Sequence, residues 1–255
     1  MLNKKILMAG ASAVAIFAAQ AAVPVEAVAG GVTDWNRFYL GAHIGAGQAN
    51  WDGILDTDNN NNDNNSFVFI DRMNTEGVLA GVQVGYNMMV NNVLFGIEGD
   101  FTWMDWEDVV KAVSSTEEVK GEVDALYSIR GRLGVAVDHD QRGVLYATAG
   151  VAWADADATV WESGLGSDPG VKFSFDDVGG VVGGGFEWAA SDTIRVRAEG
   201  LYYWFDDDVD LFAACGDACE ADPGDFVKFE DVYVIRVGAS MYFNTPSPVQ
   251  HISMK

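Results

Sequence analysis

Polar and apolar residues alternate with a period of two between residues 191 and 208 (SDTIRVRAEGLYYWFDDD). Ile194 and Trp204 fall on one face of this segment, and Arg197 and Glu199 on the other. Successive side chains of a strand point to opposite faces of a sheet. An apolar face ending in aromatic residues, opposite guanidinium and carboxylate groups, is typical of a strand with lipid outside and a polar lumen inside. The segment therefore predicts one strand of a transmembrane β-barrel.

The same alternation recurs in seven other segments, and short and long polar connections separate the eight in turn. We therefore predict an all-β fold, an eight-stranded antiparallel transmembrane β-barrel with four long outer loops and short periplasmic turns. A barrel of about eight strands has an interior that side chains can fill. The further strand segments are 38–47, 77–89, 93–103, 126–137, 144–154, 179–188 and 231–243, and the first three predicted long loops are 52–76, 107–124 and 157–176.

The first residues predict export. A basic start, an apolar run and the small residues before Gly30 indicate a cleaved signal peptide at residues 1–29, with an earlier site near Ala21 as the weaker alternative. A membrane anchor would need about 18 consecutive apolar residues, which this run lacks. We therefore expect an outer-membrane β-barrel domain at residues 30–243, followed by a periplasmic C-terminal tail at 244–255.

Charge restricts the classes of partner. The chain has 15 basic and 38 acidic residues, and loss of Lys4, Lys5 and Glu26 with the leader leaves 13 and 37, a net charge of −24. This surface would repel nucleic acid and offers no basic patch for counterion release. We therefore expect no nucleic acid, and expect contact with outer-membrane lipid and lipopolysaccharide.

Charged residues gather on the predicted inward face of five segments. The first interpretation is a salt-bridge network that plugs the lumen, because charges removed from water need partners. The alternative is an ion path. The predicted lumen network comprises Glu98, Asp100, Arg130, Arg132, Glu187, Arg195, Arg197, Glu199 and Arg236.

Several strand motifs, in this order along the chain, resemble those of the small opacity-type porin family, surface-antigen barrels of Gram-negative outer membranes. They are FYLGAHIGAG, GVLAGVQVGYN, NVLFGIEGDFTW, IRGRLGVAVD, LYATAGVAWA and VRAEGLYYWF. Members of that family are structural surface antigens, adhesion factors or hemin binders.

The resemblance implies a structural outer-membrane barrel that exposes acidic loops, with a filled lumen and at most weak conductance. Alternatives are a receptor or adhesin for hemin or for host or partner molecules, and a narrow porin. It also implies that the barrel assembly machinery recognises the last strand, although here the tail follows the terminal aromatic residue. The outward residues of that assembly signal are Tyr233, Ile235, Val237, Met241 and Phe243.

Metal and cofactor sites are poorly supported by the sequence. Asp56, Asp58 and Asn60 have the spacing of a calcium loop, but Asn61 and Phe67 replace the glycine and the bidentate glutamate that such a loop requires. We therefore expect no metal site and no cofactor. Weak binding of divalent cations in the fourth predicted loop remains an alternative, at Asp206, Asp207, Asp208 and Asp210.

Tryptophans near the long-loop ends of the strands predict an outer aromatic girdle at the membrane surface. These residues are Trp51, Trp103, Trp106, Trp153 and Trp204.

Catalysis is not expected. The three histidines, His43, His139 and His251, fall on an inner strand face, a periplasmic turn and the tail. A nucleophile, a histidine and an acid therefore cannot converge on one side of the membrane. We predict that the protein is not an enzyme.

Cys215 and Cys219 lie in the fourth predicted outer loop of an exported chain, where oxidation is permitted. We predict a disulfide between them, with Gly216 and Asp217 turning the chain so that the two Cα atoms approach. A zinc site is the alternative, but it lacks further ligands. Thiol labelling of the unreduced, denatured protein should find no free thiol. Labelling of both cysteines would contradict the prediction.

Overall fold

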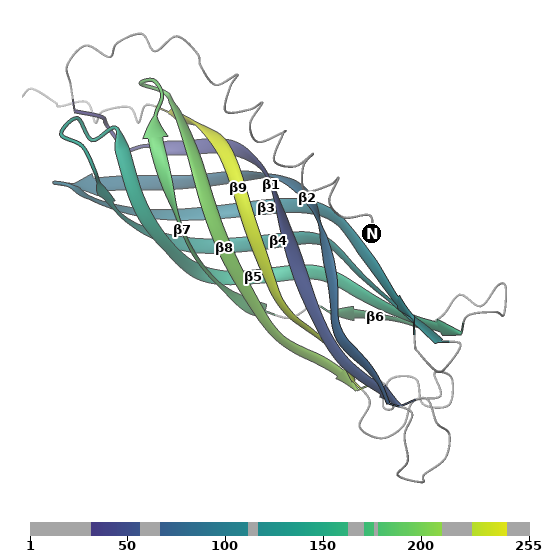
Figure 1. Cartoon of the computed structure of the whole chain (residues 1–255). Helices are drawn as coiled ribbons and strands as arrows, with labels where there is room; N and C mark the ends of the chain where they lie inside the picture. Colours follow the sequence, from purple (N-terminus) through teal and green to yellow (C-terminus); the bar gives the residue numbers. More distant parts are fainter. Residues whose placement is uncertain are drawn as a thin grey trace, which may run out of the picture.

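A computed structural model of the chain describes residues 32–56, 67–111, 117–162, 171–175, 178–210 and 226–243, which form a closed antiparallel barrel (Figure 1). The predicted fold class is confirmed. Each strand pairs with its neighbours in the order β4-β3-β2-β1-β9-β8-β7-β5, and pairing of β4 with β5 closes the barrel. The strands are β1 (Phe38–Asp56), β2 (Phe67–Val90), β3 (Val93–Lys111), β4 (Glu117–Ala136), β5 (Gly143–Glu162), β6 (Val171–Phe175), β7 (Val178–Ala189), β8 (Ile194–Asp210) and β9 (Phe226–Phe243).

β6 and β7 share one position in the barrel wall. β7 pairs with residues 143–153 of β5, and β6 pairs with residues 156–160 of the same strand. Residues 176–177, which join the two, lie outside the described part of the chain. The labelled strands therefore make the eight positions that the sequence predicts.

The strands extend further than predicted, so the predicted loop boundaries are wrong. On the long-connection side, outward positions such as Glu76, Asp105 and Asp155 are polar and exposed, whereas inward positions such as Ala154 are apolar. The apolar-outside pattern ends there although the backbone ladder continues, which is what a barrel wall that extends beyond the lipid would show. β8 in particular includes the acidic stretch that the sequence assigns to the fourth loop. The strand ends on this side are Asp56, Phe67, Lys111, Glu117, Glu162, Val171, Asp210 and Phe226.

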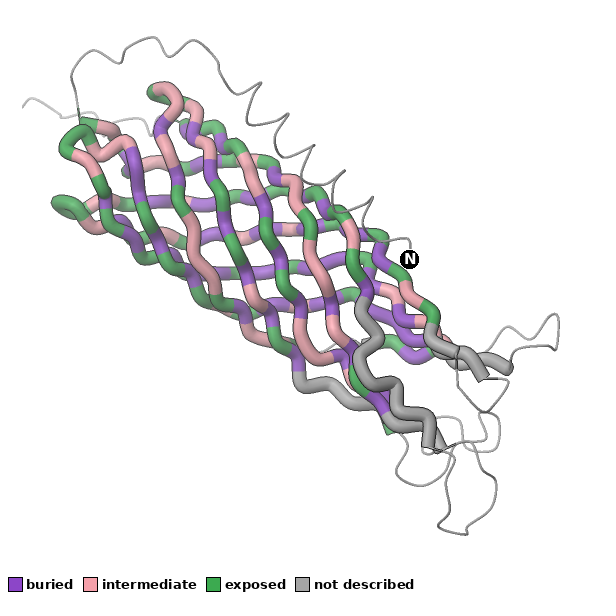
Figure 2. Tube along the Cα trace, viewed as in Figure 1, coloured by how far each residue is buried: buried purple, intermediate pink, exposed green. Residues whose placement is uncertain are grey.

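Outward and inward residues alternate along the rest of each strand, as predicted (Figure 2). On β8, Arg197 and Glu199 are buried in the lumen, whereas Ala198 and Trp204 are exposed on the outer surface. Ile235 on β9 is 75% exposed, as a lipid-facing residue should be when no lipid is present. The exterior is therefore apolar and the middle of the interior polar.

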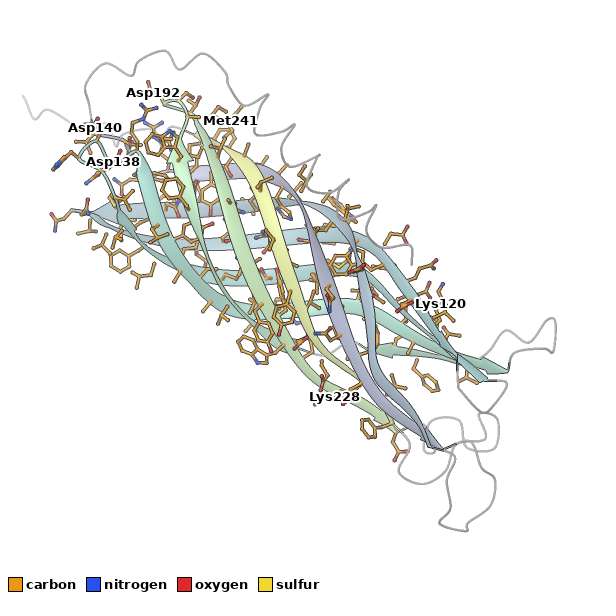
Figure 3. All side chains as sticks on the ribbon, in the orientation of Figure 1. Lys120, Asp138, Asp140, Asp192, Lys228 and Met241 are labelled. Carbon is orange, nitrogen blue, oxygen red and sulfur yellow. The ribbon has the colours of Figure 1, made fainter. Side chains whose placement is uncertain are left out.

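The short connections lie together at one end of the barrel (Figure 1). They are residues 91–92, 137–142 and 190–193, and the first is a two-residue hairpin with Asn91 at a positive φ of 56°. Strand pairing places the ends of β1 and β9 side by side, at Phe38 and Phe243. In Figure 3, the turn residues Asp138, Asp140 and Asp192 mark this end of the barrel, and Lys120 and Lys228 lie toward the other.

The predicted leader and tail lie outside the described residues, so their boundaries stay predictions. Among the described residues, no helix has the length and hydropathy needed to cross a bilayer.

Candidate functional site in the barrel lumen

Alternate residues of five strands place all nine predicted lumen residues inside the barrel, where each is buried. Because β-strand side chains have a period of two, residues two apart, such as Glu98 and Asp100 on β3, point to the same interior. Register then decides which of them meet across the lumen. The structure brings eight of the nine into one ion-pair network.

Glu98 is the centre of this network. Its Oε1 lies 2.5 Å from Arg130 Nη2, and its Oε2 pairs with Arg197 Nη1. The hydroxyl of Tyr39 donates to Oε2 at 2.6 Å, and Arg132 Nη1 lies 3.7 Å from the same oxygen. Residues from β1, β3, β4 and β8 therefore converge on one buried carboxylate.

Arg236 of β9 joins Asp100 and Glu199 into the same network. Its Nη1 lies 2.6 Å from Asp100 Oδ1, and its Nη2 lies 2.7 Å from Glu199 Oε2. Arg130 contacts the same two carboxylates, at 3.3 Å from Asp100 and 3.1 Å from Glu199. Ser128 and Tyr146 donate further hydrogen bonds to Asp100 and Glu199, respectively. Both acids are thus held from several sides.

Glu187 of β7 extends the network toward the short-turn end. Arg132 Nη2 lies 2.5 Å from Glu187 Oε2, and the hydroxyl of Tyr242 donates to Glu187 Oε1 at 2.8 Å. The Arg132 guanidinium also lies over the Tyr146 ring, 4.1 Å from its centroid. A cation over an aromatic face is stabilised by the ring quadrupole.

Arg195 is the ninth predicted residue, and the structure places it apart from this network. Its guanidinium lies 5.1 Å from the ring centroid of Trp35 and 4.8 Å from that of Tyr242. Its described hydrogen bonds go to the backbone carbonyls of Ser191, Ile194 and Asp34. It therefore closes the short-turn mouth and does not pair in the middle of the lumen.

The predicted network omits several polar residues that complete it, although the sequence places His43 on an inner strand face. His43 on β1 contacts Gln83 through Nδ1 at 2.7 Å and Thr102 through Nε2 at 3.0 Å, and Gln83 donates to Ser240 at 3.2 Å. Strand parity was the available signal, because each lies an even number of residues from a predicted inward position on its strand. The further inward polar residues that this rule adds are Asn87, Thr102, Ser128 and Tyr242.

Apolar side chains fill the lumen on both sides of the charged layer. At the short-turn end, Trp35, Tyr39 and Tyr242 pack with Leu94 and Val144. The opposite half holds a larger cluster of buried apolar residues, which the prediction of a polar lumen did not anticipate. Its large members are Trp51, Met104, Trp106, Phe173, Leu201, Tyr203, Phe205 and Phe229.

Two tryptophans of the predicted outer girdle belong to this interior cluster, so that prediction is wrong for Trp51 and Trp106. Their parity with the inward Tyr39 and Glu98 on the same strands explains why. The Trp106 indole donates to the carbonyl of Val78 at 2.8 Å. Of the other girdle residues, Trp103 and Trp204 are exposed on the outer surface and Trp153 is partly exposed.

Two glycines make room for the Trp106 ring. A Cβ at Gly77 would lie 2.6 Å from Trp106 Cδ1, and one at Gly47 would lie 2.7 Å from Cη2. Both distances are too short for real atoms. The indole can therefore lie across the lumen only because β1 and β2 carry no side chain at these positions.

The terminal-strand residues have the predicted orientation. Tyr233, Ile235, Met241 and Phe243 are exposed outward, and Val237 is partly buried on the same face. Their role as an assembly signal stays a prediction.

The predicted disulfide, Cys215 and Cys219, lies outside the described residues, as does most of the calcium-like stretch 56–67. Among the described residues, the acidic groups close enough to hold a metal ion together are Asp124, Asp155 and Asp157.

The family described as outer membrane protein beta-barrel domain matches residues 9–243. A search of the curated proteins finds no match for this chain. Among solved structures, the chain is similar to Ail, the attachment invasion locus protein of Yersinia pestis, at 14% identity over 81% of this chain and 99% of that one, with a TM-score of 0.39.

Two other solved structures are also similar to the chain. Neisserial surface protein A (NspA) is 16% identical over 81% of this chain and 97% of its own, with a TM-score of 0.42. OprG from Pseudomonas aeruginosa is 12% identical over 84% of this chain and 99% of its own, with a TM-score of 0.45. Because the family match covers most of the sequence and the chain folds as a closed barrel with an apolar exterior, the chain belongs to the outer membrane protein beta-barrel domain family.

Proposed function

We propose that this outer-membrane barrel is a structural surface protein with a closed lumen, which exposes an acidic collar outside the cell. The observation that carries the proposal is the filling of the interior in three layers. Tyr39 and Trp35 lie in the layer at the short-turn end, the network around Glu98 lies in the middle, and Trp51 and Trp106 lie in the layer beyond it.

The charged layer favours closure over transport. Four arginines and four carboxylates of equal total charge form it, and each of these residues contacts a partner of opposite sign. An ion that entered would have to displace these contacts in a low-dielectric interior, where breaking a buried pair is costly. Side-chain filling is also what a barrel of this strand number provides.

The length of the strands is evidence for the exposed collar. A tilted transmembrane strand needs about 9–11 residues, whereas β2 has 24 and β4 has 20. Trp204 is exposed on the outer surface of β8, and on β2 to β5 most of the exposed outward residues nearest the long connections are polar. On the long-connection side, the barrel therefore continues past the membrane as an acidic collar. Outward acids on this collar include Glu76, Asp105, Glu107, Asp124 and Asp155.

A role without catalysis is part of this proposal. His43 is enclosed in the lumen, and its Nδ1 contacts the amide oxygen of Gln83 where a catalytic histidine would have a carboxylate. Thr102 Oγ1, at 3.0 Å from Nε2, is buried on the wall of the same filled interior. No substrate could reach this pair without displacing the plug.

Single-channel recording in a planar bilayer tests the closed lumen. We expect the wild-type protein to show no large, stable steps, because all three layers are filled. Glu98→Ala combined with Arg197→Ala removes both members of one ion pair, so we expect small, unstable steps to appear or become more frequent. Glu107→Gln, on the exposed collar, is the matched control and should behave as wild type. Wild-type steps comparable to those of a general porin of about 16 strands would contradict the proposal.

A further inference from the structure

A groove of about 360 Å³ crosses the lipid-facing surface of β1 to β5. Gly99 on β3 forms its floor, since this outward position has no side chain. Outward residues of the neighbouring strands form its walls and ends, and each of them is partly or fully exposed. They are Leu40, Val82, Val84, Phe101, Tyr127, Ile129 and Trp153.

Strand register gives the direction of the groove. Leu40, Val84, Gly99 and Ile129 are successive partners across β1 to β4, and the row Val82, Phe101, Tyr127 and Trp153 lies beside them. The groove thus runs perpendicular to the strands between two rows of side chains. Because barrel strands are tilted, this direction rises obliquely toward the collar.

The length of the groove matches one lipid chain. From β1 to β5 there are four strand spacings of about 4.8 Å, or about 19 Å in all. One leaflet of a bilayer is about 15 Å deep, half of the hydrocarbon thickness of about 30 Å. An inclined acyl chain of the outer leaflet would therefore fill the groove. The aromatic pair Phe101 and Tyr127, with ring centroids 4.8 Å apart, would form a rigid wall for it.

An acidic group lies directly beyond the upper end of the groove. Asp155 follows Trp153 by two residues on the same face of β5, and Asp124 is the extra residue at a β-bulge opposite it. Carboxylate oxygens of Asp124, Asp155 and Asp157 lie within 4.8 Å of one another. Lys172 Nζ, 2.8 Å from Asp157 Oδ2, neutralises one of the three. Two negative charges remain at the level of the lipid headgroups.

The two carboxylates that Lys172 leaves uncompensated, Asp124 and Asp155, lie close enough together to repel each other. A hard divalent cation with oxygen ligands would relieve this repulsion and could also accept a phosphate oxygen. An anionic lipid beside such an acidic surface requires a cation of this kind between them.

We propose that the groove and the aspartates above it bind one lipopolysaccharide molecule, with an acyl chain in the groove and a divalent cation joining a headgroup phosphate to Asp124 and Asp155. The proposal rests on the membrane location of the barrel and is independent of the closed lumen, so either can fail alone.

Gly99→Leu tests the groove. A Cβ at Gly99 would meet only the carbonyl oxygen of Ser128, at 3.8 Å, so leucine fills the groove without moving the barrel. Gly200→Leu is the matched control, because Gly200 is an outward glycine of β8 with nothing within 4 Å of its Cβ position. Neither change alters the apolar character of the outer surface.

The measurement is native mass spectrometry of the full mature chain, purified from phosphatidylcholine vesicles doped with lipopolysaccharide and Mg²⁺. We expect wild type and Gly200→Leu to retain one lipopolysaccharide. Gly99→Leu should bind it about tenfold more weakly, which corresponds to a loss of about 1.4 kcal/mol. The heat-induced gel shift in phosphatidylcholine alone should be the same for all three, which shows that the barrel is intact.

A chelator tests the aspartates. We expect it to release lipopolysaccharide from wild type, whereas Asp124→Asn with Asp155→Asn should bind weakly whether or not Mg²⁺ is present. The matched double control is Asp140→Asn with Asp192→Asn, exposed acids at the opposite end of the barrel (Figure 3). Three results would each overturn the proposal. The Gly99→Leu and Gly200→Leu variants could retain lipopolysaccharide equally, or the wild type could retain phosphatidylethanolamine as well as it retains lipopolysaccharide. The mass spectrum could also show a protein dimer in place of a protein with bound lipid.

Discussion

Glu98→Ala should lower the free energy of unfolding by about 3–5 kcal/mol, the usual effect of removing one partner of a buried pair. Arg130 and Arg132 would keep other carboxylates, at Glu199 and Glu187. Arg197 would not, because its described ion pair is with Glu98 alone. The variant therefore leaves an uncompensated guanidinium in the lumen. Urea unfolding from lipid vesicles measures the effect.

A second substitution separates loss of the pair from loss of packing. Glu98→Ala with Arg197→Met removes both charges, so we expect it to be more stable than Glu98→Ala by about 1 kcal/mol or more, within the range for directly interacting residues. Glu107→Gln, which removes an exposed partner of Lys120, should change stability by only about 0–1 kcal/mol. If Glu98→Ala were as mild as Glu107→Gln, Glu98 would not be the centre of the network.

Val237→Arg should destabilise the barrel in lipid by about 2–4 kcal/mol, because Val237 faces the hydrocarbon near the middle of the apolar part of β9. Its strand partners are Ala198 on β8 and Ile44 on β1, so no acidic neighbour is available to the new charge. The same unfolding assay in vesicles measures the change.

Val237→Leu is the matched control, since it enlarges the same outward position without adding charge, and we expect a change of less than about 1.5 kcal/mol. In a short-chain detergent micelle, where water reaches the side chain more easily, the arginine variant should lose less stability. Equal stability of the arginine and leucine variants in vesicles would show that β9 presents its other face to the lipid.

Much of the barrel could be predicted because successive residues of a strand face different environments, the lipid on the outside and the polar lumen on the inside. Arg195, Arg197 and Glu199 alternate with apolar residues, so the orientation of β8 follows from the sequence alone. The alternation in the sequence stops at Trp204, although β8 continues to Asp210. On other strands the pattern reverses at this end of the barrel, where outward residues such as Asp105 and Asp155 are polar and inward residues such as Ala154 are apolar.

Nearness to a long connection predicted the side of the barrel wall on which a tryptophan lies less well than its parity along the strand did. Trp51 and Trp106 were assigned to the outer girdle because they precede long connections, although each shares the parity of inward residues on its strand. Parity would also have identified Ser128 and Tyr242 as inward. It could not have shown that Gly47 and Gly77 leave the space in which the Trp106 ring lies, because that contact joins three strands.

The sequence by itself determined which side chains enter the lumen, since a period of two and an apolar outer face leave one choice of side. The tertiary structure decided which of them meet. Barrel register carried Arg197 of β8 across to Glu98 of β3, and it left Arg195, only two residues away, between the rings of Trp35 and Tyr242 at the mouth. The physical reason is that strand periodicity is local, whereas contacts across the lumen depend on the stagger of all the strands around the barrel.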